Sequence, residues 1–76
     1  MNYKYSRQSG KFLEKIDKTT ALRILTAINK LPEGDVKKLR EYKNLYRLRV
    51  GDLRITFSRD GNLITVEEID YRGGIY

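Results

Sequence analysis

The chain contains no cysteine and no histidine, and these absences exclude several kinds of functional site. Without cysteine there is neither a disulfide framework nor a thiol nucleophile, and without both residues the usual zinc site cannot form. A chain without cysteine is compatible with a reducing cytoplasm. The first five residues lack the apolar core of a signal peptide, and no apolar run approaches the ~18–20 residues of a membrane span. We therefore expect a cytoplasmic protein that uses no membrane and no small-molecule cofactor.

What the chain has in excess is positive charge. Sixteen lysines and arginines stand against 10 aspartates and glutamates, so the formal net charge is +6 over 76 residues. A basic surface on so small a body favours a polyanionic partner, which could be nucleic acid, an acidic protein or an anionic membrane. Simple solubility is the alternative explanation. The hydrophobic content of 39% is typical of a globular protein, and the length predicts one domain, residues 1–76.

The first half of the chain carries a short strand pattern and two helical patterns. Residues 3–5 alternate with polar neighbours, which is typical of a short strand. Ser6 or Ser9 is a suitable N-cap for a first helix with Phe12, Leu13 and Ile16 on one face. Asp17 is a suitable N-cap for a second helix, which ends before Pro32. The apolar stripe of that second helix consists of Ala21, Leu22, Ile24, Leu25, Ile28 and Leu31.

A polar stretch follows the second helix. Residues 33–35 are expected to form a loop, and residues 36–44 are basic and irregular. Each lysine in this segment has an ordinary explanation as part of a solvated loop. As a second basic element beside a basic sheet, the segment would also widen a footprint for nucleic acid, and the candidate binding lysines in it are Lys37, Lys38 and Lys43.

The most informative stretch, residues 46–57, alternates strictly between apolar and polar side chains on either side of Gly51-Asp52. This pattern predicts two strands joined by a tight two-residue turn. Pairing across that turn gathers one apolar face, which must cover the helices: Tyr46, Leu48, Val50, Leu53, Ile55 and Phe57. The opposite face carries Arg47, Arg49, Arg54 and Thr56. A turn at Asp60-Gly61 and a further strand over residues 63–69 follow.

The predicted pairing places Arg49 directly opposite Arg54, with Arg47 nearby. Like charges at cross-strand positions cost a few tenths to about 1 kcal/mol, so stability alone does not explain this arrangement. A bound phosphate would remove that cost, because the planar guanidinium fork matches phosphate oxygens. In the alternative reading, a turn at Asp60-Gly61 places Glu67 opposite Arg54 and Thr65 opposite Thr56, and Glu67 neutralises one arginine on an ordinary solvated face.

These residues resemble a known family. The run Glu33-Gly34-Asp35-Val36-Lys37-Lys38-Leu39 and the run from Leu45 to Ile55, with its Tyr-Arg-Leu-Arg-Val-Gly-Asp block, are similar to the RelE/ParE superfamily of toxins from type II toxin–antitoxin systems. The ending Tyr-Arg-Gly-Gly-Ile-Tyr resembles the family's closing motif, and residues 12–18 fit its first helix. The resemblance covers nearly the whole chain, and the block is fairly specific to the superfamily but does not separate its branches.

The resemblance implies an α+β fold with two N-terminal helices packed on a curved antiparallel sheet of about four strands, a layout like that of the microbial RNases. It implies a ribosome-dependent mRNA endonuclease that inhibits translation and needs no metal, because the ribose 2′-hydroxyl attacks the adjacent phosphate. Carried over by position, the implied catalytic residues are Arg47, Arg49, Arg54, Arg72 and Tyr76. Tyr71 is a further candidate for stacking on an RNA base.

Two departures from the family pattern leave the general base open. RelE-like enzymes often carry lysine where this chain has Arg47 and Arg49, and arginine stays protonated. Many relatives carry histidine before the closing arginine, where Tyr71 stands here. The candidates for the base are Glu67, Asp70 and Tyr76.

Other functions and the expected partner also follow from the resemblance. The alternatives are a ParE-like toxin that binds DNA gyrase without nuclease activity and a plain nucleic-acid-binding module. Family membership further implies a cognate acidic antitoxin protein, partly disordered before it binds, in addition to the ribosome and mRNA. We expect this antitoxin to dock on the apolar stripe of the second helix and on an exposed sheet edge.

Overall fold

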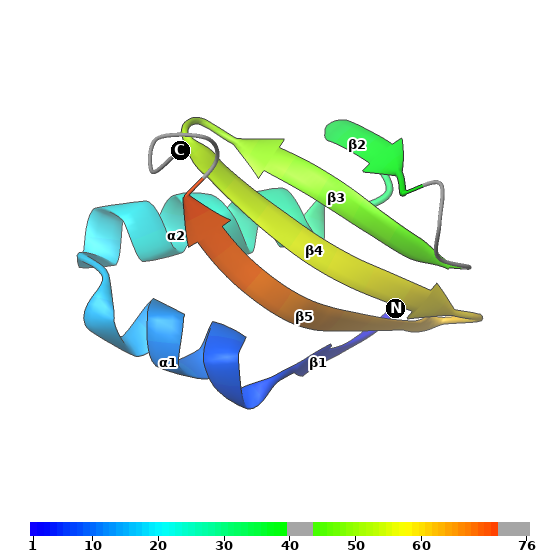
Figure 1. Ribbon diagram of the computed structural model, residues 1–76, viewed down its shortest axis with the longest axis horizontal. Helices are drawn as coiled ribbons and strands as arrows, with labels where there is room; N and C mark the ends of the chain where they lie inside the picture. The colour runs from blue at the N-terminus through cyan, green and yellow to red at the C-terminus, as the bar shows by residue number, and fades with distance from the viewer. Residues whose placement is uncertain (40–43, 72–76) are drawn as a thin grey trace.

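The structure is a computed structural model, and it describes residues 1–39 and 44–71. Within these residues the chain forms five strands and two helices, in the order β1 (Asn2–Tyr5), α1 (Arg7–Lys15), α2 (Lys18–Asn29), β2 (Asp35–Lys38), β3 (Leu45–Val50), β4 (Leu53–Asp60) and β5 (Leu63–Tyr71). One sheet contains all of these strands, in the order β1-β5-β4-β3-β2. Both helices lie on the same side of the curved sheet (Figure 1).

The expectation of two helices on a curved sheet is confirmed, but the strand count and the strand directions differ from it. The segment after the second helix contains β2, which pairs antiparallel with β3 and was expected to be irregular. Its one apolar residue, Val36, gives too short an alternation to stand out from a basic loop. The sheet is mixed rather than antiparallel, because β1 precedes the helices and pairs parallel with β5.

Both helices begin at the residues that the sequence indicates. The Ser6 side chain accepts a hydrogen bond from the backbone N–H of Ser9 at 3.1 Å, and Asp17 accepts one from that of Thr20 at 3.0 Å. Such bonds satisfy backbone donors that have no partner within the helix. The bonds from the backbone and side chain of Thr20 hold the pKa of the Asp17 carboxyl below its ordinary value.

The core lies between α2 and the helix-facing side of the sheet. Its buried residues are Ile24, Ile28, Leu31, Leu48, Leu53, Ile55, Phe57, Ile64, Val66 and Ile69. The apolar stripe of α2 is narrower than the sequence indicates, because Leu22 is 64% exposed. Within the part of the chain that the structure describes, neither helix is both long and apolar enough to cross a membrane.

Candidate functional site on the outer face of the sheet

The β3–β4 hairpin has the register predicted from the alternation. Val50 pairs with Leu53, Arg49 with Arg54 and Arg47 with Thr56 across a turn in which Gly51 has a φ of 59°. A positive φ at the first position of a two-residue turn favours glycine and matches the twist of the two strands. Leu48 and Ile55 are buried against the helices, whereas Arg49 and Arg54 are exposed. The two arginines therefore lie on the side of the sheet away from the helices, which we call the outer face.

Two rows of polar residues, all charged except Thr56, run across four strands on the outer face. Cross-strand partners share a side of a sheet, so each row follows from the register. The first row is Asp35 on β2, Arg49 on β3, Arg54 on β4 and Asp70 on β5. The second row is Lys37, Arg47, Thr56 and Glu68 on the same strands. Positive charge thus occupies the centre of the outer face, and carboxylates flank it.

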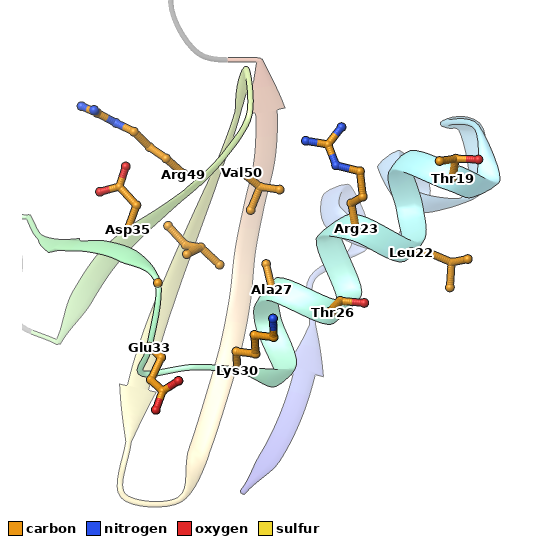
Figure 2. Close-up of a pocket in the computed structure, with 12 residues that line it drawn as sticks. Thr19, Leu22, Arg23, Thr26, Ala27, Lys30, Glu33, Asp35, Arg49 and Val50 are labelled. Atoms are coloured by element: carbon orange, nitrogen blue, oxygen red, sulfur yellow. The ribbon is translucent and has the colours of Figure 1, made fainter.

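Arg47 is held in place by the protein itself. Its residue is only 9% exposed, and its Nη1 atom lies 3.4 Å from the Oδ1 atom and 3.4 Å from the backbone carbonyl oxygen of Asp35. Among residues 1–39 and 44–71, by contrast, neither Arg49 nor Arg54 forms an ion pair. Figure 2 shows Arg49 pointing away from α2 while Val50 points toward it. Arg49 and Arg54 thus present guanidinium groups on the outer face that form no ion pair with any described residue.

The pairing of β5 differs from the prediction. Asp70, not Glu67, lies opposite Arg54, and Glu68, not Thr65, lies opposite Thr56. The turn falls one residue later than predicted, with Asp60 paired to Leu63, and a β-bulge shifts the register between Thr56 and Phe57. Glu67 lies in the bulge, and its Oε2 atom accepts a hydrogen bond from the Ser58 hydroxyl at 2.9 Å. Arg54 is therefore not neutralised by Glu67.

The remaining candidate residues are distributed as follows. Lys37 joins Arg47 on the outer face, whereas the register puts Lys38 on the side of Tyr46, toward the helices. Tyr71 also lies on the helix side, with its ring centroid 5.8 Å from that of Phe12. The structure thus does not bring Lys38 and Tyr71 together with the arginines. Lys43, Arg72 and Tyr76 lie outside the described residues.

A groove that sequence reasoning did not identify lies between α2 and β3 (Figure 2). Its volume is about 550 Å³, and its apolar lining includes Leu22, Ala27 and Val50. Arg23 and Lys30 of α2 also line it, opposite Glu33. Apart from the exposed Leu22, no signal in the sequence marks this groove, because it depends on how α2 is placed against the sheet.

The side chains of the outer face offer donors that suit an anion. Arg49 and Arg54 offer several N–H donors in rigid planar forks, and Asp70 supplies a proton acceptor beside them. Among the described residues, no group of three or more aspartates or glutamates is arranged to hold a metal ion.

Comparison with known proteins shows which proteins this chain resembles. No family model matches the chain. A curated relative, Toxin RelE3 of Methanocaldococcus jannaschii, is 40% identical over 42 residues, which are 55% of this chain. The match spans about half the length of that relative, 48%.

Solved structures match over nearly the whole chain. The RelB–RelE antitoxin–toxin complex from Methanococcus jannaschii contains a chain that is 26% identical, with a TM-score of 0.78, over 96% of this chain and 94% of that one. A chain of the archaeal RelE–RelB complex from Pyrococcus horikoshii is also 26% identical, with a TM-score of 0.79, over 96% of each chain. Taken with the two-helix, five-strand layout, these matches support a RelE-like toxin.

Proposed function

We propose that this protein is the toxin of a type II toxin–antitoxin system and that it cuts mRNA on the ribosome without a metal ion. The observation that carries this proposal is the exposed pair Arg49 and Arg54, which face each other across β3 and β4 without an ion pair among the described residues. A pair of like charges costs stability unless an anion lies between them. Phosphate oxygens match the geometry of the two guanidinium forks.

In the proposed reaction, the two arginines hold the scissile phosphate and stabilise the charge that develops on its oxygens. Donors that are already in place for this charge contribute roughly 10²- to 10³-fold each to such reactions. Arg47 is held by Asp35 and adds a fixed positive charge next to Arg49. Arg72 and Tyr76 stay candidate catalytic residues on the strength of the family resemblance.

The proposed partner is an acidic antitoxin. The solved relatives from M. jannaschii and P. horikoshii were captured with their RelB antitoxins. This chain has a net charge of +6, an apolar groove beside α2 and a short edge strand, β2. Because most of the α2 stripe is buried in the core, we place antitoxin docking on the groove, with Leu22 at its rim, rather than on the whole stripe.

Ribosomes programmed with a defined mRNA test the proposed activity. We expect the wild-type chain to cut the mRNA at discrete positions and Arg54→Ala to slow cleavage by about 10²- to 10³-fold. Arg7→Ala is the matched control, because it removes the same charge from an exposed position on α1, on the helix side of the sheet. Uncut mRNA together with poisoned gyrase would instead support the ParE-like alternative, and salt-sensitive RNA binding without cleavage would support a plain binding module.

A further inference from the structure

The β-bulge in β5 decides which side chains reach the outer face. Before the bulge, Val66 pairs with Phe57 and points into the core; after it, Asp70 pairs with Arg54. Had the first register continued, Ile69 would lie opposite Arg54, because in an antiparallel pair each step forward along β5 is one step back along β4. Ile69 would then be on the outer face, and Asp70 would point toward the core. The single inserted residue thus buries Ile69 and at the same time brings Asp70 beside the arginine pair.

Residues at the start of α1 form hydrogen bonds with the backbone of β5 along the bulge. Strand β1 ends at Tyr5, opposite Val66, so it leaves the rest of the β5 edge without a strand partner. The Ser6 hydroxyl donates to the Glu67 carbonyl oxygen at 2.6 Å, and the Ser9 hydroxyl donates to the Val66 carbonyl oxygen at 3.1 Å. Ser9 is completely buried. These side-chain bonds satisfy β5 backbone groups that a longer β1 would otherwise pair with.

Gln8 makes the most specific of these contacts. Its side-chain amide donates from Nε2 to the Ile69 carbonyl oxygen at 2.8 Å and accepts from the Ile69 N–H through Oε1 at 2.9 Å. An amide is the side chain that can replace both bonds of a neighbouring strand at once. The residue that it holds is the neighbour of Asp70, and it lies after the bulge. Gln8 therefore stabilises the register that exists only when the bulge is present.

We propose that Asp70 is the general base of the cleavage reaction and that Gln8 is a positioning residue that keeps Asp70 beside Arg54. This inference rests on the proposed function. The 2′-hydroxyl oxygen attacks the adjacent phosphorus, and the Asp70 carboxylate takes its proton. The new bond joins O2′ to phosphorus, and the bond from phosphorus to O5′ breaks. The departing O5′ takes a proton from water, so the products are a 2′,3′-cyclic phosphate and a 5′-hydroxyl end.

The geometry favours Asp70 over the other two carboxylates of β5. Glu67 lies in the bulge, level with Ser58, and already accepts a hydrogen bond from that hydroxyl. Glu68 faces Thr56, one row away from the free arginine pair. Asp70 is the direct cross-strand neighbour of Arg54, and its Oδ1 atom accepts the N–H of Tyr71 at 2.8 Å, which leaves Oδ2 for a proton. A base must come within hydrogen-bond reach of the attacking hydroxyl, so the position beside the phosphate-binding arginines decides the choice.

The first test compares isosteric amides at the three acidic positions on programmed ribosomes under single-turnover conditions. We expect Asp70→Asn to lower the rate at saturating ribosome by 10²- to 10⁴-fold, as loss of a general base does, with little change in the half-saturating concentration. Glu67→Gln and Glu68→Gln are matched controls, because they remove the same charge from the same strand and face. We expect each of them to stay within a few fold of wild type.

Chemical rescue separates a catalytic role of Asp70 from a structural one. In Asp70→Ala, added acetate or formate should restore part of the lost rate in proportion to its concentration, whereas chloride at equal ionic strength should not. A carboxylate that merely supports the fold is not replaced in this way. The absence of rescue, with Asp70→Asn cutting as fast as Glu68→Gln, would overturn the assignment of the base.

The positioning role of Gln8 is tested by combining variants. Gln8→Met keeps the length of the side chain but removes both bonds to Ile69, and we expect it to lower the single-turnover rate about tenfold without weakening ribosome binding. Because Gln8 acts through Asp70, the double variant Gln8→Met/Asp70→Asn should be no slower than Asp70→Asn alone. Losses that multiply in the double variant would show that Gln8 does not act through Asp70.

Failure of this inference can be told apart from failure of the proposed function. If wild-type protein leaves the mRNA intact, the cleavage proposal falls and the base assignment falls with it. If Arg54→Ala cuts normally, the arginine pair does not hold the scissile phosphate, and the choice of Asp70 as its neighbour loses its basis. If Arg54→Ala is inactive while Asp70→Asn is fully active, the cleavage proposal stands and Asp70 is not the base. Circular dichroism of each variant checks that it is folded before its rate is interpreted.

Discussion

The two sides of the sheet carry opposite kinds of side chain on the same strands. On the helix side, Leu53, Ile55 and Phe57 of β4 are at most 3% exposed, and the α2 residues Ile24 and Ile28 pack against this side. On the outer face, the same strand presents Arg54 beside Arg49 and Asp70. Burial of apolar surface stabilises the first side, whereas the second gathers like charges that folding alone does not favour. Stability and proposed activity are therefore carried by alternate residues of one strand.

The largest effect on the helix side should come from removing a buried side chain. Ile55 is completely buried at the centre of β4. We expect Ile55→Ala to lower the free energy of unfolding by about 2–5 kcal/mol, because it removes buried methylene groups and leaves a cavity. Denaturant titration measures this change. Below the unfolding transition, the folded variant should still cut mRNA, and selective loss of cleavage in fully folded protein would contradict the division between the two sides.

On the outer face, by contrast, a substitution should raise the free energy of unfolding. Arg49→Thr removes one member of the like-charge pair and introduces a residue that favours strands. We expect the free protein to gain a few tenths to about 1 kcal/mol of stability at low salt while its mRNA cleavage falls steeply. Thermal unfolding and programmed ribosomes measure the two effects.

The gain in stability should shrink as salt screens the repulsion. A loss of stability in Arg49→Thr would mean that Arg49 supports the fold. It would contradict the view that the arginine pair is kept on the outer face at a cost in stability.

A smaller, pH-dependent effect should appear at the start of α2. Hydrogen bonds from Thr20 lower the pKa of Asp17 in the folded state, so this carboxylate adds stability above its unfolded pKa. That contribution is lost as the pH falls through the folded pKa. Compared with Asp17→Ala, the wild type should therefore melt a few degrees higher at neutral pH, and the difference should decline in acid. A difference that stays constant down to strong acid would exclude Asp17 as a charged cap.

The sequence predicted the hairpin of β3 and β4 because its alternation is unbroken and its turn contains glycine. It predicted both helix caps for a similar reason, since the capping bonds are made between residues only three positions apart. The Arg49–Arg54 pairing, and with it the centre of the candidate site, follows from that local pattern alone.

The register of β5 could not be obtained from a strict alternation, because a bulge interrupts it. A signal was present: the buried residues Ile64, Val66 and Ile69 are spaced by two and then by three positions. That change of spacing indicates one inserted residue. The bonds from Ser6, Gln8 and Ser9 that fasten the bulge join residues 57 to 61 positions apart, so no local pattern reveals them.

The β2 strand and the groove beside α2 were missed for the same physical reason. Both depend on contacts between distant segments: β2 forms because β3 offers a free edge, and the groove forms because α2 crosses the sheet at a distance from β3. Tyr71, which was predicted to stack on an RNA base, lies beside Phe12 on the helix side, and its role in RNA binding stays a prediction.

The most direct test of the central claim is cleavage of a defined mRNA on programmed ribosomes by wild type, Arg54→Ala and Arg7→Ala, measured side by side. We expect wild type and Arg7→Ala to produce the same discrete cuts at similar rates and Arg54→Ala to be slower by about 10²- to 10³-fold. Equal cleavage by all three proteins, or none by wild type, would contradict an arginine pair that holds the scissile phosphate on the outer face of the sheet.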